Sequence, residues 1–215
     1  MKTIGLEAAV AMIPDGARVM VGGFMGVGTP ERLMNELVRQ EKRGLTVIAN
    51  DTAVPGRGLG KLVSAGVLGG AIVSHIGLNP ETQQKMIAGD IRVELVPQGS
   101  LIERIRAAGH GLGGVLTPTG LGTVAEEGKR RLEVDGRQWL LEPALYADFA
   151  LVEAFLSDYY GNLTYALTAR NFNPVIAMAA NTVIVDAAHV VPVGMISPDH
   201  VMTPAVLVDY LIARE

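Results

Sequence analysis

Two amide side chains, Asn50 and Gln98, are the residues of this 215-residue chain that the sequence places best for chemistry. Asn50 follows a short apolar segment typical of a buried strand, over residues 45–49, and Gln98 follows residues 91–96, whose apolar residues alternate as in a strand. The carboxyl ends of parallel strands meet at one edge of an open α/β sheet, where such sheets bind ligands. At that edge, the amide groups can donate hydrogen bonds to a developing oxyanion.

The sequence shows no evident nucleophile to act beside these two hydrogen-bond donors. The chain contains no cysteine and no G-x-S-x-G motif, and its four histidines lack metal-site spacing, so no metal site is expected. Of the four histidines, His75 at the end of an expected strand is the best placed to line a cleft, and a buried, hydrogen-bonded histidine is a more common interpretation than a catalytic one. Glu126 and Glu127 precede Lys129 and resemble either a carboxylate nucleophile beside a cation or the solvated first turn of a helix. The two amides therefore indicate one part of a catalytic site, the hydrogen-bond donors, without the nucleophile that would complete it.

A glycine-rich segment, DGARVMVGGFMGVGTP over residues 15–30, is the second candidate. It predicts a turn, an apolar strand over 19–21, a loop with four glycines and a helix start, with Thr29 as the N-cap and Pro30 at the first helical position. Such a loop lets backbone N–H groups approach an anionic or carbonyl-bearing ligand closely. Close packing alone also explains glycines here, and the spacing fits neither the Walker nor the dinucleotide-binding motif.

The first half of the chain alternates apolar strands with amphipathic helices. Strands are expected over 19–21, 45–49, 71–75 and 91–96, and helices over 31–43, 60–64, 80–89 and 101–108. Asn79 and Pro80 open the third helix, and Ser100 forms a capping box with Glu103 at the fourth. This alternation predicts an α/β protein with a mostly parallel sheet, helices on both faces and the strand-end turns along one edge.

The second half of the chain does not continue this regular alternation of strands and helices, and no segment resembles an interdomain linker. Asp135 and Gly136 mark a hairpin within residues 132–142, and a strand is expected over 147–154. Asn173 and Pro174 open another helix, and a last core strand over 183–185 precedes a proline-containing C-terminal segment. We therefore expect residues 1–215 to form a single domain.

Composition excludes several functional classes. The net charge of -4 argues against nucleic acid or an anionic membrane surface as the main partner. The longest nearly apolar stretch, 175–185, is too short to span a bilayer, and the N-terminus does not resemble a secretion signal. The absence of cysteine fits a cytoplasmic protein. A positive mean hydropathy of +0.31 predicts a surface buried against another subunit.

Several motifs, in order along nearly the whole chain, resemble the alpha-subunit signature of family I coenzyme A-transferases. They are Asp15-Gly16, Val19-Met20-Val21, Gly22-Gly23-Phe24, Gly28, Pro30, Ile48-Ala49-Asn50-Asp51-Thr52, Ser74-His75-Ile76-Gly77, Asn79-Pro80-Glu81, Val96-Pro97-Gln98-Gly99, Leu116-Thr117-Pro118-Thr119-Gly120, Glu126-Glu127-Gly128-Lys129 and Ala169-Arg170-Asn171-Phe172-Asn173-Pro174. The resemblance implies a three-layer α/β fold shared with ribose-5-phosphate isomerase.

The resemblance also implies an activity and a partner. The enzyme would move coenzyme A between acetyl-CoA or acetoacetyl-CoA and a short-chain carboxylate such as acetate, acetoacetate or butyrate. It would be assembled from alpha and beta chains, as an α2β2 heterotetramer, with the nucleophilic glutamate in the beta chain. That glutamate would attack the thioester in a ping-pong cycle through an anhydride and a glutamyl-CoA thioester. CoA thioesters would be substrates, and no permanently bound cofactor is expected.

For site residues, the resemblance implies that Asn50 and Gln98 lie beside that nucleophile as supporting catalytic residues. The residues implied to contact coenzyme A are Phe24, Met25, Gly26, Val27, Gly28, Thr29 and Pro30. Residues 54–66 keep the family's glycine richness without a role that we can assign. The alternatives are the corresponding chain of a succinyl-CoA:3-oxoacid CoA-transferase, a non-catalytic acyl-CoA-binding protein and a sugar-phosphate isomerase. The strand-end turns are poor in the lysine and arginine that an isomerase needs for its phosphate.

Overall fold

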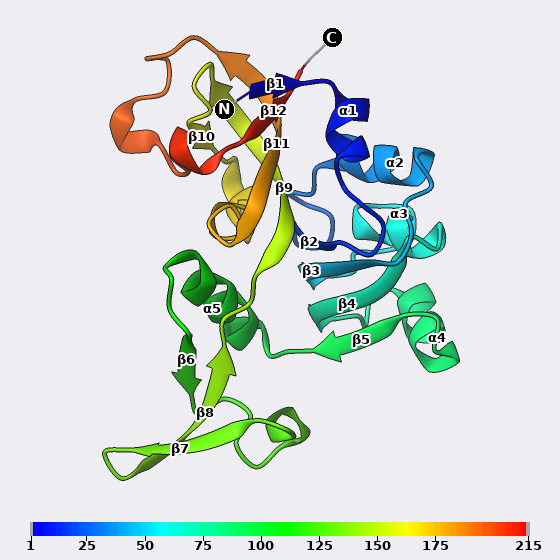
Figure 1. The fold of residues 1–215 in the computed structure, drawn as a ribbon, viewed down its shortest axis with the longest axis vertical. Helices are drawn as coiled ribbons and strands as arrows, with labels where there is room; N and C mark the ends of the chain where they lie inside the picture. Colours follow the sequence, from blue (N-terminus) through cyan, green and yellow to red (C-terminus); the bar gives the residue numbers. More distant parts are fainter. Residues whose placement is uncertain (1, 214–215) are drawn as a thin grey trace.

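The computed structural model describes residues 2–213, most of which surround one large sheet (Figure 1). Its strands, in spatial order, are β1 (Lys2–Ile4), β12 (Tyr210–Ile212), β11 (Ala180–Val191), β9 (Ala147–Asp158), β2 (Arg18–Val21), β3 (Leu45–Asp51), β4 (Leu68–His75) and β5 (Arg92–Leu95). All these neighbours pair in parallel, and the short β10 (Leu163–Thr164) pairs antiparallel with β9. The predicted mostly parallel sheet is therefore confirmed.

The central strands are buried on both faces, as their continuous apolar runs predict. Val19 and Val47 pack into the core cluster on one face, whereas Met20 and Ile48 pack into the cluster on the other face. The alternation follows from the two-residue period of a strand, which sends successive side chains to opposite faces.

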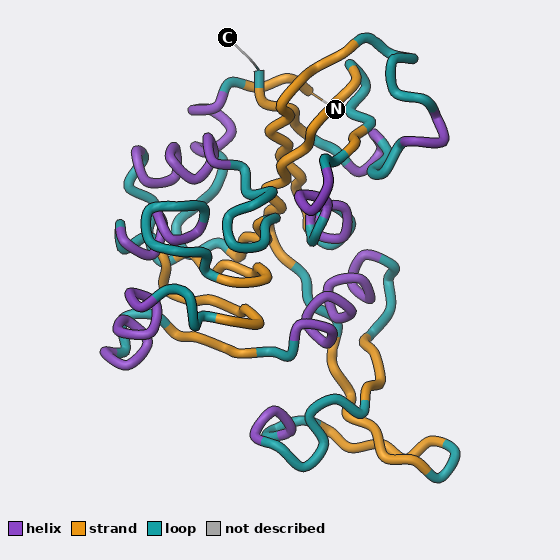
Figure 2. Tube along the Cα trace, turned by 180° about the vertical axis from the view of Figure 1, so that it is seen from behind, coloured by secondary structure: helices purple, strands orange, loops and turns teal. Residues whose placement is uncertain are grey.

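Helices cover both faces and make three layers. The helices α1 (Leu6–Ala11), α2 (Glu31–Arg39) and α3 (Leu59–Ser64) contribute to one cluster, with α4 (Pro80–Ala88) beside α3. The other face is covered by α5 (Gln98–Gly109) and the short α6 (Asn173–Ile176). Figure 2 shows the same layers from behind. No helix within residues 2–213 has the length and apolar character needed to cross a membrane.

The ends of two helices differ from the prediction. Pro30, not Thr29, occupies the N-cap position of α2, and no side chain caps that helix. The same helix ends at Arg39 because Glu41 adopts a left-handed conformation with φ of 53°. Ser100 lies inside α5, which begins earlier because the Pro97 carbonyl accepts from the Leu101 N–H at 2.9 Å. The predicted capping box is therefore wrong.

The predicted cap at Asn79 is confirmed, since its side-chain oxygen accepts from the Thr82 N–H at 3.2 Å. The predicted hairpin is confirmed as well. Asp135 and Gly136, both with positive φ, connect β7 (Arg130–Val134) to β8 (Arg137–Pro143). Together with β6 (Gly114–Thr117), these strands form a small antiparallel sheet that projects from the body (Figure 1). Short 3₁₀ turns complete the chain: η1 (Val124–Glu126), η2 (Leu167–Arg170), η3 (Pro198–His200) and η4 (Ala205–Leu207).

Candidate active site

The fold brings Asn50 and Gln98 into direct contact across 48 residues of sequence. The Gln98 Nε2 donates to the Asn50 Oδ1 at 2.5 Å. Asn50 lies near the carboxyl end of strand β3 and is 1% exposed, whereas Gln98 is the first residue of α5 and is exposed to solvent. An amide nitrogen carries two N–H groups, so Gln98 keeps one donor available for a ligand.

Asp51 fixes the orientation of the Asn50 amide. Its carboxylate accepts from the Asn50 Nδ2 at 2.7 Å, from the Ala53 N–H at 2.6 Å and from the Met25 N–H at 3.0 Å. The Asn50 oxygen is thereby left facing Gln98. No role for Asp51 was predicted from the sequence, which singled it out only within the family motif over residues 48–52.

The two amides line a pair of adjoining cavities. The larger, of about 420 Å³, is bounded by the amides, by α5 and by the segment after η2; its lining residues are Phe24, Asn50, Gln98, Gly99, Ile102, Thr168, Asn171 and Phe172. The smaller, of about 300 Å³, shares Phe24 and both amides and adds Met25, Ser74, His75 and Leu78. His75 therefore lines a cleft, as predicted, but it is exposed to solvent, so the interpretation as a buried histidine is wrong. Among the described residues lining these two cavities, none is a carboxylate.

Two further asparagines hold the glycine loop in place. The Asn171 Oδ1 accepts from the Gly23 N–H at 3.0 Å, while its Nδ2 donates to the Val27 carbonyl at 2.9 Å. The Asn173 Nδ2 donates to the Gly28 carbonyl at 2.8 Å. These contacts join segments more than 140 residues apart, and the family resemblance was the only signal for Asn171, whereas Asn173 was also expected at a helix start.

The glycines of the loop are required by packing. Gly23 has φ of +127°, and a Cβ placed there would lie 2.0 Å from the Thr29 hydroxyl. Gly28 has φ of +83°, and its Cβ would lie 2.7 Å from the Ala169 carbonyl. A side chain at either position would therefore displace the loop, so the packing interpretation of the glycines holds irrespective of any ligand.

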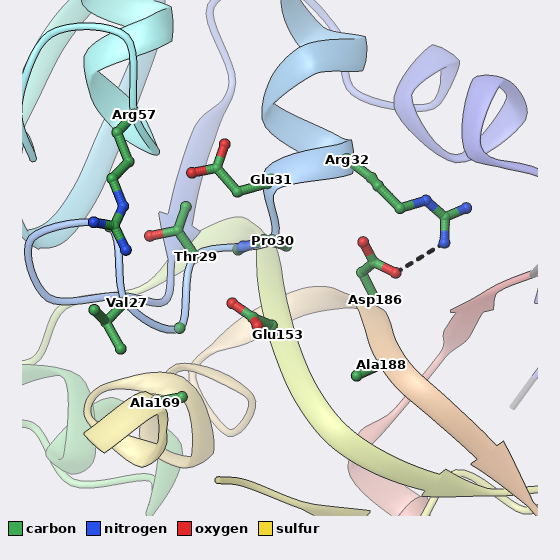
Figure 3. A pocket seen from close by; sticks show the side chains of 12 residues that line it. Val27, Thr29, Pro30, Glu31, Arg32, Arg57, Glu153, Ala169, Asp186 and Ala188 are labelled. Atoms are coloured by element: carbon green, nitrogen blue, oxygen red, sulfur yellow. Dashed lines mark hydrogen bonds and ion pairs between the residues drawn. The ribbon is translucent and has the colours of Figure 1, made fainter. Parts of the chain in front are cut away.

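The seven predicted loop residues divide between two sides of the loop. Phe24 and Met25 face the amide cavities, whereas the loop residues 26–30 line a separate cavity of about 410 Å³, drawn in Figure 3. In that cavity, Glu153 of β9 lies directly across from Asp186 of β11. Burial raises the pKa of Glu153 to about 7, and the nearby negative charges of Asp186 and Glu31 add to the increase.

The Glu126 carboxylate lies elsewhere, on η1 beside the small sheet. It pairs with Arg131 and accepts from the Gly122 N–H at 2.7 Å, and these partners hold its pKa below the usual range. The residue lines neither amide cavity. Glu126 ends a short 3₁₀ turn and its side chain is 16% exposed, so neither the nucleophile interpretation nor the solvated helix turn is supported for it.

Fold and cavities together define a three-layer α/β protein with cavities at the carboxyl ends of its parallel strands, where open α/β sheets commonly bind ligands. The chain belongs to the coenzyme A transferase family, whose sequence pattern matches residues 3–214. The predicted family and fold class are confirmed, and the protein is a CoA-transferase polypeptide.

Similar proteins support this assignment. The chain is 52% identical to the alpha chain of the acetate CoA-transferase of Escherichia coli, over 100% of this chain and 97% of the relative. It is 46% identical to the acetoacetyl-CoA:acetate/butyrate CoA transferase alpha subunit of Clostridium acetobutylicum, over 98% and 97% of the two chains. An acyl-CoA transferase of E. coli, solved as a thioester complex with CoA, matches the fold with a TM-score of 0.87 at 23% identity. That match covers 99% of this chain and 47% of the solved chain.

Proposed function

We propose that residues 1–215 form the alpha-subunit domain of a short-chain acyl CoA-transferase. The enzyme moves coenzyme A between acetyl-CoA or acetoacetyl-CoA and a carboxylate such as acetate, acetoacetate or butyrate. The names of the two similar alpha subunits support these substrates. The observation that carries the proposal is the amide pair, Gln98 donating to Asn50, beside a cavity whose described lining residues include no carboxylate.

In the proposed reaction, a glutamate of the partner chain attacks the thioester carbonyl, which forms an acyl-glutamyl anhydride and releases the CoA thiolate. The thiolate then attacks the glutamyl carbonyl, giving the glutamyl-CoA thioester and the free carboxylate. A second carboxylate reverses these steps and leaves as the new CoA thioester. Gln98 donates its remaining N–H to the oxyanion, and Asn50, held by Asp51, keeps that donor oriented.

The glycine loop is proposed to contact the CoA thioester over Phe24, Met25, Gly26, Val27, Gly28, Thr29 and Pro30. Within residues 2–213, no acceptor bonds the N–H of Gly26 or Gly28, so both are available to a ligand carbonyl or phosphate. Phe24 is 46% exposed at the edge of the amide cavity and offers an apolar contact. CoA thioesters are bound here as substrates, without a permanently held cofactor.

The partner is proposed to be a beta chain, in an α2β2 assembly in the cytoplasm. The similar proteins are named alpha subunits, which supports a second kind of chain. Leu167 is 94% exposed and directly precedes Thr168 at the edge of the amide cavity, where an apolar partner surface would cover it.

Reconstitution tests the proposal. The chain mixed with its beta partner is expected to exchange CoA from acetoacetyl-CoA to acetate, and the chain alone is expected to be inactive. A panel of acetate, butyrate and succinate distinguishes the short-chain enzyme from a succinyl-CoA-dependent one. Borohydride reduction of the CoA adduct should modify the beta chain, and a modified side chain in this chain would contradict the proposal. Acyl-CoA binding by this chain with no exchange in the mixture would favour a non-catalytic binding protein.

A further inference from the structure

The strand β7 forms an edge of the small antiparallel sheet and lacks a partner strand on its outer side. The order of that sheet is β6, β8 and β7, so β7 pairs only with β8 among the described strands. Figure 1 shows β7 on the side of the small sheet away from the large sheet. Four of its residues, Arg130, Arg131, Glu133 and Val134, are exposed, and Leu132 is half-buried. An exposed edge strand of this kind can pair with a further strand.

The backbone groups of Arg131 and Glu133 face this free edge. The turn at residues 135–136 contains two residues, so the flanking Val134 and Arg137 bond to each other, and the bonding direction alternates from there along the strand. The N–H and C=O groups of Arg131 and Glu133 therefore point away from β8. Within residues 2–213, no turn or loop backbone group bonds to them. They are available to a strand from another molecule.

The side chains of β7 are complementary to a second copy of the same strand. Over residues 129–135, KRRLEVD, the basic side chains precede Leu132 and the acidic ones follow it. In an antiparallel pair centred on Leu132, Arg131 of each copy lies opposite Glu133 of the other. Opposite charges at directly paired positions stabilise a sheet. This register also pairs the two residues whose backbone groups face outward, as hydrogen bonding between antiparallel strands requires.

Other registers are less favourable. A pair centred on Arg131 or on Glu133 keeps the backbone match, but it places like charges directly opposite each other, which destabilises a sheet. Charge and backbone geometry together therefore favour the pair centred on Leu132.

The contacts within the chain leave both charges able to make this pair. The Glu133 carboxylate accepts from the neutral Gln138 amide at 2.9 Å, and no ion pair of Glu133 occurs within the described residues. Arg131 pairs with Glu126, and its side chain is 56% exposed. Because a guanidinium carries five N–H donors, Arg131 can bind a second carboxylate.

Apolar side chains on one face of the small sheet add to the contact. Leu132 pairs with Trp139, and Leu116 pairs with Leu141, so these side chains share a face with Val134. Leu116 and Val134 are 40% and 42% exposed. In a pair centred on Leu132, this residue meets its own copy and removes apolar surface from water.

We propose that β7 pairs antiparallel with β7 of a second copy of this chain, with Leu132 on the twofold axis, so that two small sheets join into one. The contact is isologous, because both copies present the same strand and the symmetry closes after two copies. In the proposed assembly, it is a contact between the two alpha chains. It does not depend on the proposed reaction.

Charge reversal at the paired positions tests the proposal. The unsubstituted chain alone, with a monomer mass of 22.7 kDa, is expected to sediment as a dimer at micromolar concentration. Arg131→Glu and Glu133→Arg each place like charges opposite each other, so each should weaken the dimer at least about 10-fold. An equimolar mixture of the two variants restores both opposite-charge pairs and should dimerise about as tightly as the unsubstituted chain.

Asp90→Arg makes the same change in charge as Glu133→Arg, at an exposed position outside the small sheet, and should leave the dimer unchanged. Three results would overturn the proposal: a monomeric unsubstituted chain, a dimer that both reversals leave intact, or a mixture of the two folded variants that stays monomeric. Circular dichroism establishes that the variants are folded.

Cross-linking locates the contact without a charge reversal. The chain contains no cysteine, so a single introduced cysteine reports one position. Leu132→Cys places two thiols at directly opposed, non-hydrogen-bonded positions within reach of a disulfide, and oxidised glutathione should convert this variant into a covalent dimer. In Val134→Cys, on the same face, the two thiols would be about 13 Å apart along the strands, so this control should not cross-link.

Equal cross-linking of the two cysteine variants, or none of Leu132→Cys, would contradict the pair centred on Leu132. An assembled enzyme that exchanges no CoA would contradict the proposed function instead, and the sedimentation and cross-linking results would still decide the contact.

Discussion

Asp51 and Met25 are joined by a hydrogen bond from the Met25 N–H to the Asp51 carboxylate at 3.0 Å. The same carboxylate accepts from the Asn50 amide, so one buried charge orients the amide pair and holds the glycine loop. The two parts of the proposed site, which are separated in sequence, therefore depend on a common anchor.

Asp51→Asn is expected to lower both activity and stability. The substituted amide offers one acceptor oxygen where three donors converge, and its own N–H groups would face other donors. We expect kcat of the assembled enzyme to fall about 10- to 100-fold and the free energy of unfolding by about 1–3 kcal/mol. Steady-state kinetics and urea denaturation measure these changes. The control Asp90→Asn, at an exposed position, should change neither, and a fully active Asp51→Asn enzyme would show that the anchor is dispensable.

Gln98→Ala is expected to lower kcat of the assembled enzyme about 10- to 1000-fold, because an oxyanion donor is removed. Asn50→Ala should act through the same donor, since the two amides share a hydrogen bond. The double variant should therefore lose less than the product of the two single losses. If the fold-losses in kcat of the two single variants multiply exactly in the double variant, the two amides do not share a role.

The free energy of unfolding of the isolated chain should depend on Glu153 in a defined pH window. Its folded-state pKa of about 7 lies above the ordinary glutamate value of 4.5, so the folded chain binds the proton more tightly than the unfolded chain. The contribution of the Glu153 carboxyl to the free energy of unfolding is complete below pH 4.5 and is lost as the pH rises through 7. Glu153→Gln should therefore match the wild type near pH 4.5 and exceed it by about 1–2 kcal/mol at about pH 8, after allowance for solvent screening.

Urea denaturation at the two pH values measures this difference. Glu127→Gln, at an exposed position, is the matched control for the loss of one negative charge and should show no such pH dependence. A Glu153→Gln variant that is less stable than the wild type at the higher pH would mean that the carboxylate is stabilised rather than strained in the fold.

Glu142 anchors the small sheet to the body. Its side chain is buried, pairs with Lys129 at 2.6 Å and lies 3.9 Å from the Nε of Arg104 on α5. Glu142→Leu should destabilise the chain by about 3–5 kcal/mol, because Lys129 loses its counter-charge in a partly buried setting, whereas Arg104 keeps its ion pair with Glu94 at 3.2 Å. Glu127→Leu, at an exposed position before β7, is the control. Equal denaturation midpoints for the two variants would remove the anchoring role.

Much of the architecture follows from local sequence. The apolar runs at residues 19–21 and 45–49 predict strands buried on both faces. The turn at Asp135 and Gly136 predicts a hairpin. Both predictions succeed because strand burial and turn conformation depend on nearby residues. The cap at Asn79 follows for the same reason. The caps proposed at Thr29 and Ser100 were wrong, since the neighbouring prolines at 30 and 97 occupy the cap positions instead.

By itself, the sequence determined the parallel α/β class, the family and the two amides as candidate residues, since each rests on periodicity or on short motifs. Only the tertiary structure decided which groups meet: Gln98 with Asn50, Asp51 with the loop at Met25, and Asn171 with Gly23. It also placed Glu153 across from Asp186. Such contacts join distant strands and turns, and their geometry depends on sheet order and register, which no local pattern encodes.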